Sequence, residues 1–231
     1  MIVALLSDVH ANLPALEVFV RITKGLADSY VCLGDMVNYG PWNDECLELI
    51  HSLTNLVLLE GNHERLFLGL DAIENEAPLV QEFYDHSFRR FRRKDLITGL
   101  PASHRLGSFI CTHTIDNQKI YSDTDLQVSD SYIIGHTHRQ FHVQRSGKHI
   151  LNCGSVGQNR AYIDAVNCAL YDTCSGRITL CEETYPMHHF MRELSVRGYS
   201  KRCIEYYLRK ERRMATGTRK YCVEFVTDEG K

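Results

Sequence analysis

The sequence predicts a layered α/β fold built around buried strands. Short apolar runs of four or five residues recur along the chain, and each ends in a turn, as buried strands do. Helical stretches separate the first three runs, whereas later runs follow one another directly. This order favours a layered α/β architecture over an all-β barrel. A length of 231 residues fits one domain with a small appendage.

The apolar runs place the strands, and turn or cap residues place the elements between them. We expect strands at residues 2–6, 30–33, 56–59, 108–111, 132–134, 149–151, 168–171 and 178–181. A first helix is expected from the N-cap Asn12, with Pro14 in its first turn, to about residue 24. Asn43 or Asp44 begins a second helix that reaches about residue 53. A hairpin is expected at Ser146-Gly147-Lys148, between residues 141–145 and the strand at 149–151.

The remaining segments are predicted to be helical. Residues 63–95 show no strand signal, and Pro78 divides them into two helices, the second from about residue 79 to 94. Residues 187–213 read as helix with a break near Gly198, followed by a tail or an added edge strand at 221–226. We therefore expect a domain at 1–186 and a basic helical C-terminal extension at 187–231 packed on that domain.

Composition excludes several classes of protein. Hydrophobic residues make up 44% and charged residues 24% of the chain, which excludes disordered and coiled-coil classes. No apolar run approaches the ~20 residues of a spanning helix, so we expect no membrane association. The start of the chain lacks a basic leader, and its nine cysteines contain no C-x-x-C pair, so we expect no signal peptide and a cytoplasmic location. The net charge is −3, although residues 192–220 hold ten Lys and Arg against three Asp and Glu.

The strongest functional signal is the set of polar residues that follow the first five strands. In chain order these are Asp8 and His10, Asp35, Asn62 and His63, His113, and His136 and His138. The carboxyl ends of strands in open α/β sheets converge on the ligand crevice. In an extended chain, the two polar residues of Asp-x-His and of His-x-His would also point the same way. We therefore expect these side chains to form one cluster.

This ligand set predicts two metal ions. Carboxylate and imidazole without thiolate suit Mn²⁺, Fe²⁺, Zn²⁺ or Ni²⁺. The set is too large for one four-coordinate ion, whereas a pair of ions about 3.5–4 Å apart would use all of it. A single histidine at a strand end is more often a hydrogen-bonded structural residue, and we assign the other seven to that class: His51, His86, His104, His142, His149, His188 and His189.

The motifs together resemble those of the calcineurin-like metallophosphoesterase superfamily. They are Asp8-x-His10, Gly34-Asp35, Gly61-Asn62-His63-Glu64, Thr112-His113 and Gly135-His136-Thr137-His138. The likeness covers residues 1 to about 172. Asn152-x-Gly154-Ser155-Val156-Gly157-Gln158-x-Arg160 and Gly34-Asp35-Met36-Val37-Asn38-Tyr39-Gly40-Pro41 are similar to the small bacterial and archaeal phosphodiesterase branch. The resemblance implies a four-layer sandwich of two mixed β-sheets flanked by helices.

The resemblance also implies a role for each motif residue. Asp8, His10 and His138 would hold a first metal, Asn62, His113 and His136 a second, and Asp35 would bridge both. His63 would be the catalytic residue over the substrate. Two divalent transition-metal ions are implied, with Mn²⁺ favoured and Fe²⁺, Zn²⁺ or Ni²⁺ as alternatives. The expected reaction is hydrolysis of phosphodiesters by in-line attack of a metal-bridging hydroxide. The expected substrate is small and nucleotide-like, and phosphomonoesters and dinucleoside polyphosphates remain open.

Departures from the family pattern and two other functions bear on this prediction. Protein phosphatases of the superfamily carry Asp-Arg-Gly where this chain has Asn38-Tyr39-Gly40, so we do not expect a protein phosphatase. The residue that orients His63 is unassigned, although Glu64 is adjacent. A nuclease is one alternative, because residues 192–220 are basic, but the chain leaves little room for a nucleic-acid-binding domain. A non-catalytic scaffold, like the retromer subunit of this superfamily, is the other. That subunit has lost the catalytic histidine, which this chain keeps.

Overall fold

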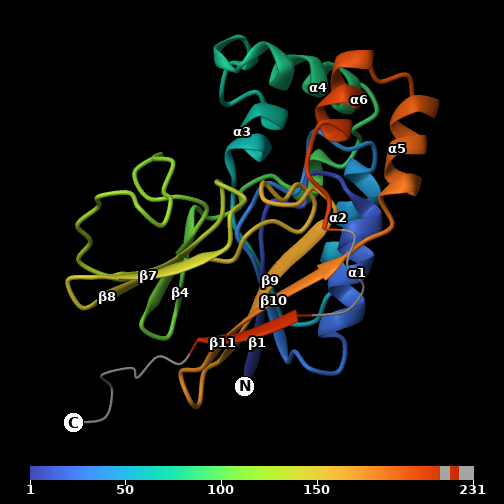
Figure 1. Cartoon of the computed structure of the whole chain (residues 1–231). Coiled ribbons are helices and arrows are strands. Elements are labelled where there is room, and N and C mark those ends of the chain that lie inside the picture. The colour runs from blue at the N-terminus through green and yellow to red at the C-terminus, as the bar shows by residue number, and fades with distance from the viewer. Residues whose placement is uncertain (214–218, 224–231) are drawn as a thin grey trace.

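Two mixed β-sheets stacked face to face form the centre of the molecule (Figure 1). The computed structural model describes residues 1–213 and 219–223. The first sheet has six strands in the order β11 (Arg219–Val223), β10 (Ile178–Thr184), β9 (Ala165–Asp172), β1 (Ile2–Leu6), β2 (Ser29–Cys32) and β3 (Leu56–Leu58). The second has five in the order β4 (Ser103–Leu106), β5 (Phe109–Thr112), β6 (Ser131–Ile134), β8 (Lys148–Asn152) and β7 (Phe141–Arg145). Each sheet contains three neighbouring parallel strands, β1–β2–β3 and β5–β6–β8.

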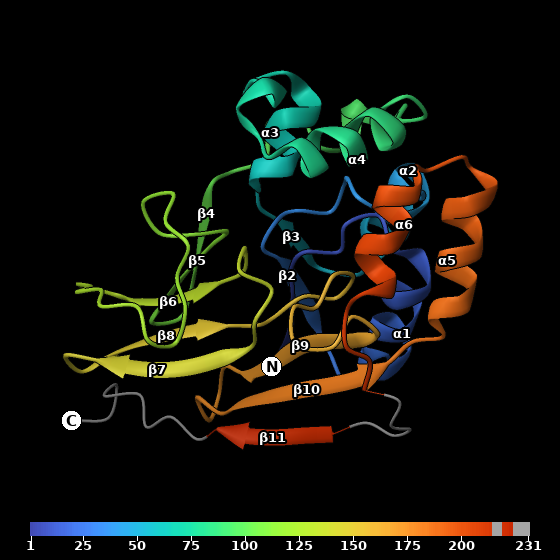
Figure 2. The same ribbon diagram turned by 45° about the horizontal axis from the view of Figure 1, so that its top comes forward.

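Helices cover the outer face of the first sheet and extend beyond its carboxyl-end rim (Figure 2). They are α1 (Leu13–Thr23), α2 (Asn43–His51), α3 (Asn62–Leu68), α4 (Pro78–Phe88), α5 (Met187–Val196) and α6 (Lys201–Leu208). Helix α1 packs on β9 and β10, and α5 packs on α1. None of the described helices combines the length and apolarity needed to cross a lipid bilayer.

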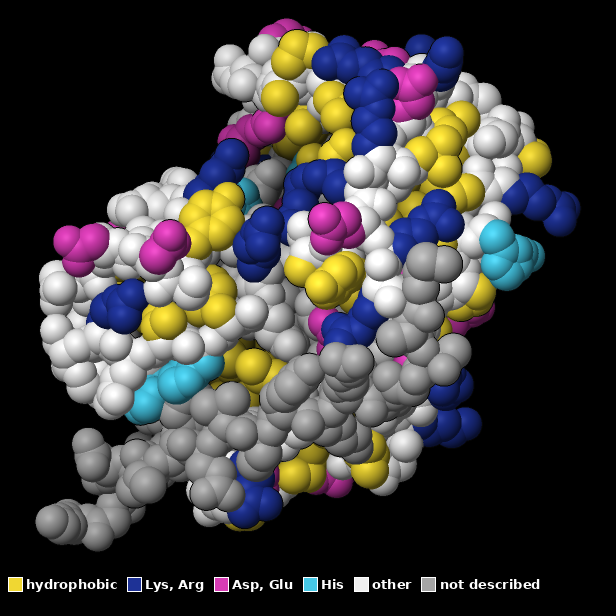
Figure 3. Space-filling model, in the orientation of Figure 1, with side chains coloured by type: hydrophobic (Ala, Val, Ile, Leu, Met, Phe, Trp, Pro, Cys, Tyr) yellow, Lys and Arg dark blue, Asp and Glu magenta, His cyan; other side chains and the backbone are white. Residues whose placement is uncertain are grey.

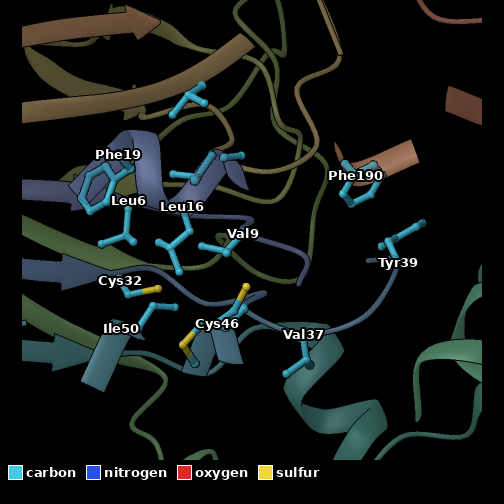
Figure 4. Packing of buried hydrophobic residues seen from close by; sticks show 14 of the residues in the cluster. Leu6, Val9, Leu16, Phe19, Cys32, Val37, Tyr39, Cys46, Ile50 and Phe190 are labelled. Atoms are coloured by element: carbon cyan, nitrogen blue, oxygen red, sulfur yellow. The ribbon is translucent and has the colours of Figure 1, made fainter. Parts of the chain in front are cut away.

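Alternation along β1 produces two separate cores. Val3 and Leu5 face the second sheet, whereas Ala4 and Leu6 face the helices, because successive side chains of a strand point to opposite faces. On the helical side, Leu6 converges with Phe19 of α1 and Ile50 of α2 (Figure 4). Full burial of side chains of this size stabilises a fold by about 1.5–3 kcal/mol each. The first sheet is therefore packed on both faces, against the helices on one side and against the second sheet on the other.

The outer face of the second sheet is covered by a long loop. Ile115 and Ile120 of residues 113–130 pack on Ile134 of β6 and Ile150 of β8, and all four side chains are buried. In the structure, this loop packs on the sheet as a covering layer.

All eight predicted strands and the hairpin are present, with ends shifted by at most a few residues. Strand β4 was missed because its sequence, Ser-His-Arg-Leu, is polar and it lies at a sheet edge, where mainly Leu106 is buried. The predicted edge strand at 221–226 is present as β11, and its last three residues lie outside the described residues.

The helix expected at 79–94 is wrong at its C-terminal end, because α4 stops at Phe88. The carboxylate of Asp44, in the first turn of α2, accepts the backbone N–H groups of Arg92 and Arg93, at 3.0 and 3.3 Å. These N–H groups therefore do not serve a helix. Residues 89–93 are four arginines and one phenylalanine, and this local sequence does not indicate that a carboxylate 48 residues before Arg92 accepts two of their N–H groups.

The predicted C-terminal helices are present as α5 and α6, with the break at Gly198. Phe190 of α5 and Tyr207 of α6 are fully buried and belong to the same core as α1. Several of the basic residues on these helices form ion pairs at the surface: Arg197 with Glu193, Arg202 with Glu82, and Arg209 with Glu205.

Candidate metal centre

The structure brings the predicted ligand side chains together at the carboxyl ends of β1, β2, β3, β5 and β6. Their ligating atoms fall into two groups within which all atoms lie within 4.8 Å of one another. The first group contains Asp8, His10, Asp35 and His138, and the second contains Asp35, His113 and His136. The Asn62 side-chain oxygen joins the second group, 3.2 Å from His113 Nε2 and 3.0 Å from His136 Nδ1.

Asp35 is the residue that the two groups share. Its Oδ2 lies 3.2 Å from His113 Nε2 and 3.8 Å from His10 Nε2. Within the first group, His138 Nε2 lies 3.1 Å from His10 Nε2 and 3.2 Å from Asp8 Oδ1. The two groups of candidate ligands therefore meet at one carboxylate, that of Asp35.

Backbone carbonyl groups set the tautomers of three histidines. His10 Nδ1 lies 3.2 Å from Val37 O, His113 Nδ1 2.9 Å from Leu33 O, and His138 Nδ1 2.8 Å from Gln158 O. A carbonyl oxygen only accepts hydrogen bonds, so each Nδ1 carries the proton and donates it. In a neutral ring, Nε2 then presents its lone pair to the cluster. Orientation of this kind by a carbonyl is typical of metal-ligating histidines.

An unsatisfied carboxylate oxygen tests whether these residues fit a cation. Asp8 is fully buried, and its Oδ2 accepts the backbone N–H of His136 at 3.0 Å. Its Oδ1 has no hydrogen-bond partner and faces Nε2 of His138. A buried charged oxygen without a partner is costly. A divalent cation between this oxygen and the imidazole lone pairs would satisfy all of them, so the residues fit the metals that the family binds.

Electrostatics within the cluster favour cation binding. Burial raises the pKa of Asp8, but neighbouring His138 outweighs it and lowers the pKa to about 2. Burial lowers the pKa of His113, but the Asp35 carboxylate outweighs it and raises the pKa to about 10. Burial and nearby His113 lower the pKa of His136 to about 4. The His113 ring therefore carries an additional proton at neutral pH in the metal-free protein, beside the Asp35 carboxylate. A metal ion bound at His113 Nε2 would displace that proton.

The ligands are carried on turns rather than on extended chain. Asp8, His10, His136 and His138 have φ values of 54°, 48°, 68° and 57°. Left-handed backbone costs non-glycine residues roughly 1–2 kcal/mol each and clusters at functional sites. The expectation that alternate residues of an extended strand supply both ligands is therefore wrong. His136 and His138 in fact belong to different groups.

His63 lies beside both groups without belonging to either. It is 5% exposed, and its Nε2 lies 3.9 Å from Asp35 Oδ2. Its Nδ1 lies 2.9 Å from Asn38 Nδ2, while Asn38 Oδ1 accepts the backbone N–H of Tyr39 at 2.7 Å. That second bond sets the orientation of the amide, so Nδ2 donates to His63 Nδ1 and the ring proton sits on Nε2, facing the cluster. The sequence marked Asn38 only as a departure from protein phosphatases.

Asn38→Gly is expected to lower kcat about tenfold to hundredfold, with bound metal and KM little changed. Glycine accepts the φ of 73° at residue 38 without strain but cannot position His63. Metal analysis and steady-state kinetics test this expectation. Asn55→Gly is the matched control, because Asn55 has a φ of 50° and is exposed far from the site. A variant with the wild-type kcat would show that Asn38 does not position His63.

Glu64 has a different role from the adjacent His63. Its carboxylate is fully buried and accepts the backbone N–H groups of Asp35, Met36 and Gly61, at 2.7, 2.7 and 2.9 Å. It ties together the two turns that carry Asp35 and Asn62, and it makes no hydrogen bond to His63. Burial and the nearby Asp35 carboxylate raise the pKa of Glu64 to about 7.

Glu64→Gln is expected to destabilise the metal-free protein by about 2 kcal/mol, because the amide NH₂ would face backbone N–H donors. Urea unfolding measures the effect. The matched control, Glu17→Gln on the exposed face of α1, should change stability by less than about 0.5 kcal/mol. Equal stability of the two variants would contradict the role of Glu64 as a tie between the turns.

A cleft of about 450 Å³ opens above the cluster and is lined in part by His63 and His136. Basic side chains from distant parts of the chain, Lys119, Arg139, Arg160 and Lys210, also line it. In Figure 3, dark-blue Lys and Arg side chains surround the hollow in which cyan histidine side chains are visible, with some acidic side chains among them. The sequence named Arg160 within a motif but gave no signal that Lys210 would reach the same cleft.

A family model matches most of this chain, and solved structures share its fold. Residues 1–176 match the family model described as the calcineurin-like phosphoesterase superfamily domain. The uncharacterized protein MJ0912 of Methanocaldococcus jannaschii is 24% identical over 220 residues, 79% of this chain and 87% of that protein. A metallophosphoesterase from Sphaerobacter thermophilus has a TM-score of 0.73 and 23% identity, covering 90% of this chain and 98% of that one. The hypothetical protein PH1004 from Pyrococcus horikoshii OT3 has a TM-score of 0.74 and 15% identity, covering 89% and 97%. This chain belongs to the calcineurin-like phosphoesterase superfamily.

Proposed function

We propose that the protein is a dinuclear-metal-dependent phosphoesterase that hydrolyses small, nucleotide-like phosphodiesters in the cytoplasm. The observation that carries the proposal is the pair of ligand groups that share Asp35, one of which contains the unsatisfied Oδ1 of Asp8. Asp8, His10, His138 and Asp35 would hold one ion, and Asn62, His113, His136 and Asp35 the other. Mn²⁺ is the favoured ion, with Fe²⁺, Zn²⁺ and Ni²⁺ as alternatives.

The charge of the cluster supports an anionic substrate. Asp8 and Asp35 bring two carboxylates to the cluster, and the pKa values of both are lowered, so both are ionised at neutral pH. Two bound divalent cations would outweigh that negative charge, neutralise phosphate oxygens and lower the pKa of a bound water. The ligand side chains are held in place before the substrate arrives. Three backbone carbonyl groups orient ligand histidines, and the Glu64 carboxylate fixes the turn that carries Asp35.

His63 is placed to act on the substrate from the protein side. Its Nδ1 accepts from Asn38, so its Nε2–H points toward the cleft above the ligand groups. A donor at this position can stabilise, by a hydrogen bond, the oxygen of the departing group, on which negative charge builds.

Hydrolysis of bis-p-nitrophenyl phosphate and of p-nitrophenyl phosphate, with measured metal content, tests the proposed function. Chelated protein is expected to be inactive, and loading with Mn²⁺ is expected to restore two ions per chain and turnover of the diester. The same loading is repeated with Fe²⁺, Zn²⁺ and Ni²⁺ to rank the metals. Preference for the monoester would replace the diester assignment. If the protein binds two metal ions but hydrolyses neither ester, the result would contradict the phosphoesterase function and favour a non-catalytic scaffold.

A further inference from the structure

The cleft above the metal centre continues into an outer cleft of about 420 Å³. Arg139, Arg160 and Lys210 line both clefts and therefore lie where the two join. They come from three places: Arg139 follows the ligand His138, Arg160 lies in the loop between β8 and β9, and Lys210 follows α6. Three cations thus converge a short distance from the metal ligands.

One aromatic ring holds two of these cations in place. The guanidinium carbon of Arg160 lies 5.8 Å from the ring centroid of Tyr206, and Lys210 Nζ lies 5.0 Å from it. Both distances are within the range of cation–π attraction. The Tyr206 hydroxyl also accepts a hydrogen bond from Arg160 Nη1. The backbone N–H of Arg160 donates to the carbonyl of His138 at 3.3 Å, so its position is linked to a metal ligand.

The charges of these three residues are not neutralised by the protein. Among the described residues, no carboxylate forms an ion pair with Arg139, Arg160 or Lys210, although Asp35 and Glu76 line the cleft above the metal centre and Glu211 lines the outer cleft. Elsewhere in the same basic segment, Arg202 and Arg209 pair with glutamates. Burial, Arg160 and Arg139 all lower the pKa of Lys210, in that order of size. Like charges held together repel one another, and a bound anion relieves the repulsion.

We propose that Arg139, Arg160 and Lys210 bind a second phosphate group of the substrate, separate from the phosphate at the metal centre. This inference rests on the proposed function and narrows its substrate class to small molecules with a phosphate beyond the scissile one. Arg160 supplies a planar fork of donors that suits phosphate oxygens, and Lys210 adds a point charge. The metal centre would then cleave a phosphoester whose distant phosphate is bound by Arg139, Arg160 and Lys210.

Two chromogenic diesters that differ in one phosphate test the inference. Thymidine 5′-(p-nitrophenyl phosphate) lacks the second phosphate, and its 3′-phosphorylated counterpart carries it. With Mn²⁺-loaded enzyme, kcat/KM is expected to be at least about tenfold higher for the 3′-phosphorylated ester, the effect of one good charge-assisted contact. Arg160→Gln and Lys210→Met should each bring this ratio close to one. Lys201→Met, at an exposed lysine of helix α6, the helix that Lys210 follows, is the matched control and should keep the ratio.

A binding measurement gives a second readout that does not depend on turnover. Calorimetric titration of the protein with thymidine 3′,5′-bisphosphate and with thymidine 5′-monophosphate should show tighter binding of the bisphosphate, weakened about tenfold by Lys210→Met. Equal kcat/KM for the two esters in the wild type would overturn the second-phosphate site and leave the phosphoesterase intact. If p-nitrophenolate is released from neither ester, the result would overturn the proposed function itself. Faster hydrolysis of a thymidine oligonucleotide than of the 3′-phosphorylated ester would assign the site to a polynucleotide backbone instead.

Discussion

Replacing Asp35 by asparagine is expected to abolish hydrolysis and to lower bound metal from two ions per chain to one or fewer. Asp35 is the carboxylate shared by both ligand groups, and its Oδ2 approaches histidines of each. Asparagine keeps the shape and one oxygen but removes the charge. Metal ions contribute several kcal/mol to transition-state stabilisation, so a rate loss of at least about 10³-fold is expected.

Metal analysis of the purified variant, combined with its melting temperature, separates this effect from misfolding. Mn²⁺ should raise the melting temperature of the wild type, because a ligand at 100 times its Kd adds about 2.7 kcal/mol of stability. The Asp35→Asn variant should show little of this increase, while the chelated proteins melt at similar temperatures. Asp85→Asn, an exposed change on α4, is the matched control. Two bound ions in the Asp35→Asn variant would contradict the shared-ligand role.

The strands could be predicted from sequence because each is a local apolar run, but their order in the sheets could not. Strand β1 pairs with β9, more than 160 residues later, and β8 inserts between β6 and β7. Such pairings depend on which faces of distant strands bury together, and no short window contains that information. The polar edge strand β4 was not predicted because its own composition gives no strand signal. It is a strand because it pairs with its neighbour β5.

The candidate site shows the same division between local and distant information. The candidate ligand residues could be predicted from the sequence, since each follows an apolar run, and in the structure they lie close together. The left-handed turns that orient Asp8 and His138 could not be predicted, because these turns are stabilised by packing and by carbonyl groups that are distant in the sequence. Glu64 was considered for orienting His63 because it is adjacent, yet Asn38, 25 residues earlier, makes that contact. Adjacent side chains on a helix point in different directions, so sequence proximity misled here.

His63→Ala is expected to lower kcat by about 10²–10⁴-fold while leaving two metal ions bound. The imidazole is outside both ligand groups, and its Nδ1 is occupied by Asn38, so its removal should not release a metal. Kinetics with bis-p-nitrophenyl phosphate and metal analysis of the same preparation give both numbers. His86→Ala, a change at a histidine of α4 that packs on Tyr199, is the matched control and should retain wild-type kcat.

The dependence on the departing group then tells how His63 acts. If its Nε2–H stabilises the departing oxygen by a hydrogen bond, His63→Ala should lower kcat more with an alkyl ester, whose departing oxygen is more basic, than with a p-nitrophenyl ester, whose anion leaves unaided. Equal losses with both esters would mean that His63 only binds phosphate oxygens. A fall in bound metal would instead make His63 a ligand, and the position of Asn38 against its Nδ1 would then serve the metal rather than the substrate. Because the scaffold alternative predicts no turnover in any variant, a graded loss that follows the ester would by itself exclude the scaffold.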